Sequence, residues 1–243
     1  MFVERQMLAT GAVNMTMSTA QMYAMVDYFA PDRIIGGGLL DALQMNPDRL
    51  DDRDFLMRGY AELIADKVLE ARFDNTIGVR ALEEDDAMMS LMAFAVGNIM
   101  AEMSTCTEIE VMLGKGVVSM VVIEASNGCW AALWKAKDGV GLIGGFSHSG
   151  KSESVRLKIS PFIGKANMNS MPLNIRIRQQ AMDGSIIMST SMYGDSNRFH
   201  ERIPENRMLR RNTENMMKSY DGSEFVYSGR ELNDRIVDAL EVM

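Results

Sequence analysis

Residues 145–152, GFSHSGKS, match the spacing of a phosphate-binding loop. In such a loop backbone N–H groups surround the phosphates, the lysine reaches the terminal phosphate and the serine holds magnesium. A helix must follow, because its N-terminus completes the anion site. Residues 154–159, SVRLKI, alternate like a strand instead, and Pro161 follows closely. We therefore predict a hairpin loop and keep a nucleotide-binding enzyme as the alternative. The motif residues are Gly145, Gly150, Lys151 and Ser152.

Few other residues have the types and spacing needed for catalysis. His148 and His200 are the two histidines of the chain, too few for a multi-histidine metal site. Cys106 and Cys129 form neither a zinc-binding CxxC pair nor a disulfide framework, so we interpret them as buried thiols in a reducing compartment. We expect no metal and no cofactor, and an enzyme is the less favoured class of protein.

Basic residues alternate with apolar residues in three predicted strands, 129–137, 154–159 and 174–180. Side chains two positions apart in a strand point to the same side of the sheet, so each strand has an apolar side and a basic side. Like charges on neighbouring strands repel each other, and an anionic partner would relieve that repulsion. A solvated surface is the alternative. The six basic residues, with no acidic residue among them, are Lys135, Lys137, Arg156, Lys158, Arg176 and Arg178.

A second basic cluster lies in a polar helix predicted from Pro204 to about Ser219. Its three- and four-residue spacing places Arg207, Arg210 and Arg211 on one helical face. Aromatic residues do not interleave with these bases, so any binding of RNA or DNA would be electrostatic and sequence-tolerant. An anionic membrane surface and the acidic part of a neighbouring copy are the other partners that fit this charge.

The elements that position these residues change character near residue 107. Residues 1–106 show helical spacing, with a helix capped by Ser18 or Thr19, a short helix after Gly36–Gly38, and a longer helix capped by Asp51 or Asp52. The longer helix is expected to include Val68 and Leu69 and to end at Asp74–Asn75. Another helix is expected to begin at Glu83–Asp86, where acidic residues complement the helix dipole, and to continue through Met100. The strands are expected at 108–113, 117–124, 129–137, 139–146, 153–160, 173–180 and 185–192.

These patterns predict an α+β protein in three parts. Short connections and turn signals such as Asn127–Gly128 favour antiparallel pairing over βαβ units. We expect an acidic N-terminal helical subdomain, 1–106, packed on a mostly antiparallel β-sandwich or barrel-like subdomain, 107–195. A C-terminal helical segment, 196–243, follows, with helices at 204–219 and 231–242.

Charge and methionine content bear on the partners of the chain. Residues 1–110 carry 19 acidic and 8 basic residues, a net charge of −11, whereas residues 111–243 carry 14 and 17, a net charge of +3. The 24 methionines either fill the core in place of leucine or form a self-association surface. We expect no membrane-spanning helix, because no apolar run is long enough, and no signal peptide, because Glu4, Arg5 and Gln6 interrupt any early apolar run.

We therefore predict a non-enzymatic, self-assembling protein, a homo-oligomer that binds RNA, DNA or an acidic partner surface through a basic sheet face. Viral structural and nucleic-acid-handling proteins combine features of this kind, which is an analogy of general type and not of family. The predicted location is the cytoplasm, or the host cytoplasm or virion if the protein is viral.

Overall fold

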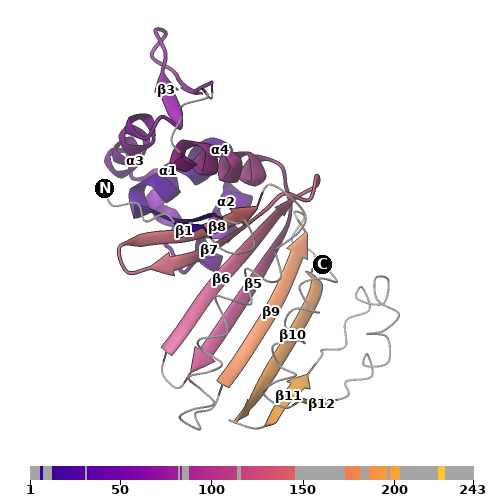
Figure 1. The fold of residues 1–243 in the computed structure, drawn as a ribbon. Helices are drawn as coiled ribbons and strands as arrows, with labels where there is room; N and C mark the ends of the chain where they lie inside the picture. The colour runs from indigo at the N-terminus through magenta and orange to yellow at the C-terminus, as the bar shows by residue number, and fades with distance from the viewer. Residues whose placement is uncertain are drawn as a thin grey trace. The chain divides into compact units, whose positions relative to one another are not determined.

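The computed structural model describes residues 6–7, 13–30, 32–81, 83, 88–113, 116–145, 173–181, 186–195, 198–202 and 224–227. These residues form helices and antiparallel strands, so the predicted α+β class is confirmed (Figure 1). The chain divides into two compact units that alternate along the sequence. The first unit contains Met1–Ser104 and Ile123–His148, and the second contains Thr105–Val122 and Ser149–Met243.

The described helices belong to the first unit. Ser18 caps α1 (Thr19–Phe29), as predicted, because Ser18 and Gln21 each accept a hydrogen bond from the other's backbone N–H. Asp52 caps α3 (Arg53–Ala65) by accepting from the backbone N–H of Phe55. The helix expected to begin at Glu83–Asp86 is α4 (Met88–Ala101), and Glu83 lies outside it. The remaining helices are α2 (Arg33–Ala42) and the 3-10 helix η1 (Pro47–Asp51).

The predicted ends of two helices are wrong. Gly36–Gly38 lie inside α2 and not before it, because the N–H of Gly36 donates to the carbonyl of Asp32 at 2.8 Å and starts the helix early. The third helix ends at Ala65, since Lys67 adopts a left-handed conformation with φ 58°. The chain then forms a hairpin of β3 (Leu69–Ala71) and β4 (Ile77–Val79), and Asp74–Asn75 lie in its turn.

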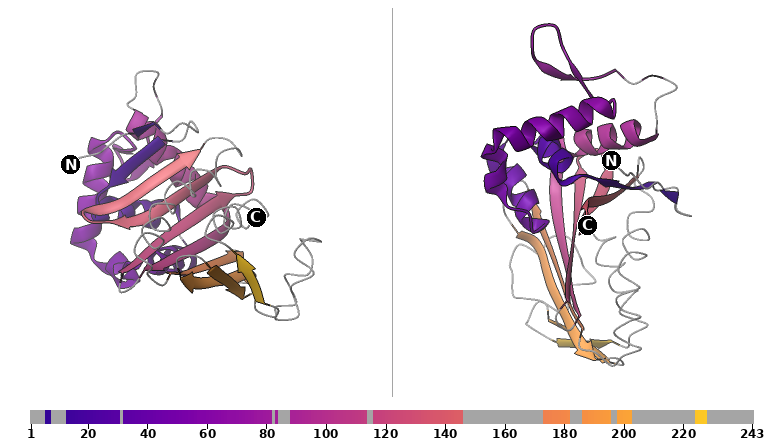
Figure 2. Two further views of the ribbon diagram at one scale, coloured as in Figure 1. Left: turned by 60° about the horizontal axis from the view of Figure 1, so that its bottom comes forward. Right: turned by 90° about the vertical axis from the view of Figure 1, so that its left-hand side faces the viewer.

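The sheet of the first unit contains β1 (Gln6–Met7), β2 (Val13–Met17), β7 (Trp130–Ala136) and β8 (Gly139–Gly145). The strand order is β1-β2-β8-β7, and β7 is followed by β6 (Gly116–Ala125), whose last residues belong to this unit. Helix α1 packs on α3 and β8, and α4 packs on β7. Figure 2 shows the helices of this unit along its strands.

Methionine contributes much of the described core, as the sequence predicts. Met57 on α3 is an exception among the described residues, because its side chain is exposed. Methionine therefore replaces branched aliphatic residues in the interior, where its flexible side chain fills irregular gaps. The buried methionines are Met15, Met17, Met22, Met25, Met45, Met92, Met100, Met103 and Met120.

The second unit is an amphipathic sheet with the order β6-β5-β9-β10-β11-β12. Ile109, Val111, Ile175 and Ile177 are fully or almost fully buried on one side of β5 and β9. The described strands do not close into a barrel, so the barrel-like form predicted for 107–195 is wrong. Turn signals predict which neighbouring strands pair, but they do not predict whether the sheet closes into a barrel. The strands are β5 (Met103–Leu113), β9 (Leu173–Ala181), β10 (Ile186–Asp195), β11 (Arg198–Arg202) and β12 (Glu224–Tyr227).

The segment 196–243 was expected to be helical, and two of its described pieces, β11 and β12, are strands. The helices expected at 204–219 and 231–242 and the strand expected at 153–160 lie outside the described residues. The domain boundaries at 106 and 195 stay predictions.

Candidate functional site

Two of the predicted basic residues, Arg176 and Arg178, are exposed side by side along β9. They alternate with Ile175 and Ile177, which are completely buried. The alternation predicted for this strand is therefore confirmed. Gln179, the next residue on the buried side, is also buried, in register with Thr107 of β5.

The partner of these arginines within the sheet is a pair of glutamates that the sequence analysis overlooked. The antiparallel register of β5 and β9 places Glu108 opposite Arg178 and Glu110 opposite Arg176. An oxygen of Glu110 lies 3.6 Å from a guanidinium nitrogen of Arg176. We call these four residues the charge ladder. Its formal charge is zero, so the basic side of β9 is compensated within the sheet and is not a uniformly positive surface.

The two signs of the charge ladder differ in their exposure to solvent. The side chain of Arg176 is 61% exposed and that of Glu110 is 34% exposed. Burial raises the pKa of Glu108, although the neighbouring Arg178 lowers it, and Glu110 raises it further. The arginine side chains therefore present the more accessible ends of the ladder, and the carboxylates lie closer to the sheet.

The register continues the row of Arg176 across the remaining strands. Arg176 pairs with Ser191 of β10, Ser191 pairs with Arg202 of β11, and Arg202 pairs with Glu224 of β12. Basic positions thus occur on β9 and β11, with a serine position between them.

The other predicted binding residues do not join this ladder in the described structure. Lys135 and Lys137 are exposed at the end of β7 in the first unit. The ammonium of Lys135 donates to the carbonyl oxygen of Gln44, just after α2, at 3.2 Å. A cation near the last carbonyls of a helix is favourable. Arg156, Lys158, Arg207, Arg210 and Arg211 lie outside the described residues.

The phosphate-loop match begins at the end of a strand. Gly145 is the last residue of β8, which pairs antiparallel with both β7 and β2. Phosphate loops of nucleotide-binding proteins follow a strand and open a helix in a βαβ setting. Gly150, Lys151 and Ser152, and the segment after them that distinguishes the two interpretations, lie outside the described residues.

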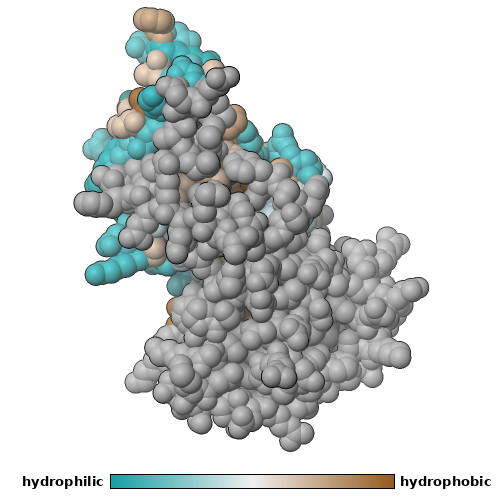
Figure 3. Space-filling view, viewed as in Figure 1, coloured by the Kyte–Doolittle hydropathy of each residue, from teal (hydrophilic) through white to brown (hydrophobic). Residues whose placement is uncertain are grey.

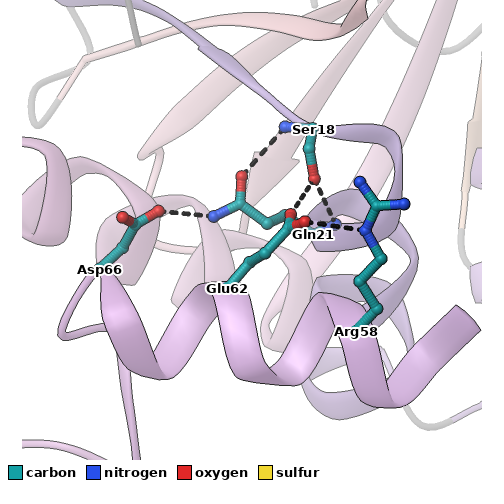
Figure 4. Close-up of polar contacts among 5 residues, drawn as sticks. All are labelled: Ser18, Gln21, Arg58, Glu62 and Asp66. Carbon is teal, nitrogen blue, oxygen red and sulfur yellow. Dashed lines mark hydrogen bonds and ion pairs between the residues drawn. The ribbon is translucent and has the colours of Figure 1, made fainter. Parts of the chain in front are cut away.

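A cluster of polar side chains joins α1 and α3 (Figure 4). The hydroxyl of Ser18 donates to Glu62, and Glu62 also accepts from Arg58 at 3.1 Å. The buried amide of Gln21 donates to Asp66 at 2.6 Å. These groups satisfy one another and the helix ends, so the cluster serves as a structural capping network.

Asp66 gives this network a pH dependence. Burial raises its pKa, the Gln21 hydrogen bond lowers it, and Glu62 raises it. Because the pKa of Asp66 is higher in the folded state, the folded protein holds this proton more tightly than the unfolded chain does. The resulting stability is fully present below the unfolded pKa of about 3.9, and it is lost as the pH rises through the folded pKa. Replacing Asp66 by asparagine removes this loss, so the free energy of unfolding of the variant, relative to wild type, should increase as the pH rises above about 4.

Urea unfolding at several pH values checks this prediction, with Asp41→Asn as a charge-matched, exposed control. A stability difference between wild type and Asp66→Asn that does not change with pH, or that changes in the opposite direction, contradicts the prediction.

The remaining candidate residues offer few groups suited to catalysis or metal binding. Burial raises the pKa of the Cys106 thiol to about 12, and Glu108 adds to this effect, so the thiol is not a nucleophile near neutral pH. Within the described part of the chain, no three His, Cys, Asp or Glu residues cluster closely enough to hold a metal ion. No helix in that part is both long and apolar enough to cross a bilayer.

Comparison with known proteins adds no assignment: neither a protein family nor a curated protein sequence matches the chain.

Proposed function

We propose that this chain is a non-enzymatic assembly protein whose copies associate head to tail, the arginines of β9 binding an acidic surface of the next copy. The observation that carries the proposal is the exposed pair Arg176 and Arg178, set above half-buried carboxylates. RNA and DNA are the competing polyanions, and the experiment below separates them from a partner copy.

The ion pair between Arg176 and Glu110 leaves the arginine available to a partner. Exposed pairs of this kind contribute about 0–1 kcal/mol, because water competes for both groups. The 3.6 Å separation between Arg176 and Glu110 is long for a charge-assisted hydrogen bond. A guanidinium group has five donors, so Arg176 can engage a second carboxylate from another molecule while it stays near Glu110.

The first unit offers an acidic surface of the matching sign. Six exposed aspartates lie between residues 32 and 54, the stretch that contains α2, η1 and the start of α3, against three arginines in the same stretch. A contact between two unlike surfaces of one chain is heterologous, and it builds rings or filaments and not a closed twofold dimer. The aspartates are Asp32, Asp41, Asp48, Asp51, Asp52 and Asp54.

Two matched variants test this proposal in opposite directions. Replacing Arg176 and Arg178 by glutamine should shift the protein to the mass of one chain, 27.1 kDa, because the basic partner is lost. Replacing Glu108 and Glu110 by glutamine should strengthen assembly, because it removes the internal competitors. Light scattering at low and high salt measures both, with circular dichroism to confirm folding. Salt screens exposed charges over about 10 Å at 0.1 M, so wild-type assemblies should dissociate as salt rises.

Adding RNA distinguishes the polyanion alternative. Assembly that requires RNA, with affinity falling log-linearly with salt, assigns the arginines to phosphate contacts instead. A wild-type chain that remains at the mass of one copy at low salt, with or without RNA, excludes head-to-tail assembly.

A further inference from the structure

The hairpin of β3 and β4 carries the most exposed aromatic side chain in the described structure. It forms a two-stranded sheet of its own and projects beyond the helices of the first unit (Figures 1 and 2). The relative exposure of Phe73, in its turn, is 110%, so the ring makes almost no contact with the rest of the chain. Figure 3 shows the hairpin standing clear of the surface, with hydrophilic atoms below a hydrophobic tip.

The turn that presents Phe73 is well organised. The N–H of Arg72 donates to the carbonyl of Thr76 at 2.8 Å, and Asn75 adopts a left-handed conformation with φ 62°. The carboxylate of Asp74 accepts from the hydroxyl of Thr76 at 2.6 Å and from its N–H at 3.0 Å. These bonds lower the pKa of Asp74, so it is ionised at neutral pH. The turn therefore holds an aromatic ring beside a fixed negative charge. We call Phe73 and Asp74 the hairpin tip.

A fully exposed phenylalanine on an ordered turn gains little in the isolated chain but is well suited to anchor a partner. Aromatic side chains supply much of the affinity at protein interfaces, whereas exposed ion pairs supply little. The head-to-tail contact proposed above consists of exposed charges, and it lacks such an anchor. Of the large apolar side chains exposed in the described structure, Phe73 is more exposed than Met57 at 53% and Val117 at 48%.

The chain already contains the combination of groups that the hairpin tip would need in a partner. Within the first unit the guanidinium carbon of Arg49 lies 4.1 Å from the centre of the Phe55 ring. The same guanidinium lies 3.7 Å from the carboxylate of Asp52. One arginine thus stacks on a phenylalanine and pairs with an aspartate at once, a favourable cation–π arrangement.

From this complementarity we infer that the hairpin tip of one copy docks on the arginines of β9 in the next copy. Phe73 stacks on one guanidinium group and Asp74 pairs with the other, on the exposed ends of Arg176 and Arg178. This inference rests on the proposed head-to-tail assembly and assigns the docking element to the hairpin tip, with the exposed aspartates of residues 32–54 as the alternative acidic surface. The projecting hairpin reaches a neighbouring copy without displacing any side chain of its own unit.

Two variants each remove one side of this contact. Phe73→Ala/Asp74→Asn removes the ring and the charge, and asparagine keeps the oxygen that accepts from Thr76. Arg176→Gln/Arg178→Gln removes the basic side. Each variant alone should elute at the mass of one chain while it remains folded by circular dichroism. The matched control, Met57→Ala/Glu102→Gln, removes an exposed apolar side chain and one negative charge elsewhere on the first unit and should assemble like wild type.

Mixing the two variants is the decisive measurement. The arginine variant keeps its hairpin tip and the hairpin variant keeps its arginines, so one intact contact is possible between them. We expect a 1:1 heterodimer of twice 27.1 kDa, and no larger species. Two variants that are each monomeric but do not combine overturn the inference, because they then act on different contacts. Assembly of the hairpin variant like wild type also overturns it, while the proposed function stands. A wild-type protein that remains monomeric contradicts both this inference and the proposed function.

Discussion

Replacing Gly59 by alanine should lower the free energy of unfolding by about 3 kcal/mol, at the upper end of the usual cost of overpacking. Gly59 lies where α3 crosses α1, and a Cβ atom there would be 2.1 Å from the carbonyl oxygen of Ala20. It would also lie 2.9 Å from the Cβ of Ala24. The oxygen belongs to the backbone of a helix, so it cannot rotate away, and the helices must separate.

Gly38→Ala is the matched control for this prediction. A Cβ at Gly38, which is exposed in α2, would meet no atom within 4 Å. Alanine there should stabilise the helix by about 0.5–1 kcal/mol, because glycine loses more backbone entropy on folding. Urea unfolding followed by circular dichroism compares the two variants. Equal stabilities would show that Gly59 is not the tight contact between α1 and α3.

Replacing Trp130 by alanine should cost about 3–5 kcal/mol, the usual range for truncating a buried tryptophan. Trp130 is 1% exposed and is the largest of the fully buried side chains. It stands at the start of β7 in register with Gly145, which has no side chain to fill the space that an alanine would leave. The loss should appear as a lower urea midpoint with an unchanged slope.

Trp130→Phe is the control, because it keeps a large aromatic ring at this position and should lose much less stability than the alanine variant. The chain has two tryptophans, and Trp134 remains in both variants as a fluorescent probe of the first unit. A cost below about 1 kcal/mol for Trp130→Ala would mean that the surrounding side chains collapse into the cavity.

The strands were predictable where hydrophobic alternation and turn residues agree. The two-residue turn at Lys137–Asp138 and the Asn127–Gly128 turn, with Gly128 at φ 81°, separate strands whose observed ends differ from prediction by a few residues. The end of α3 was missed because Val68 and Leu69 continue the helical apolar spacing, although Val68 lies just before β3 and Leu69 is its first residue. Val68 and Leu69 are buried in the observed structure, and a longer helix would bury them as well. The burial pattern alone therefore does not distinguish a helix from a strand here.

The charge ladder was missed for a different reason. Periodicity shows which residues of a strand share a side, but it does not show which strands are neighbours. Glu108 and Glu110 alternate with Ile109 at the same spacing as Arg176 and Arg178 around Ile177. That matching spacing with opposite signs was the available signal, because opposite charges across antiparallel strands stabilise their pairing.

The division of the chain into alternating segments has a consequence during synthesis on the ribosome. Strand β5 ends at Leu113, and β9, its neighbour in the sheet, begins at Leu173. The nascent chain therefore carries β5 without this partner until the ribosome has made a long intervening segment, and an uncovered strand is a site of aggregation. Glu108 and Glu110 place two negative charges on that strand. We therefore expect the same carboxylates that later face the arginines to disfavour pairing of the incomplete sheet with other nascent chains.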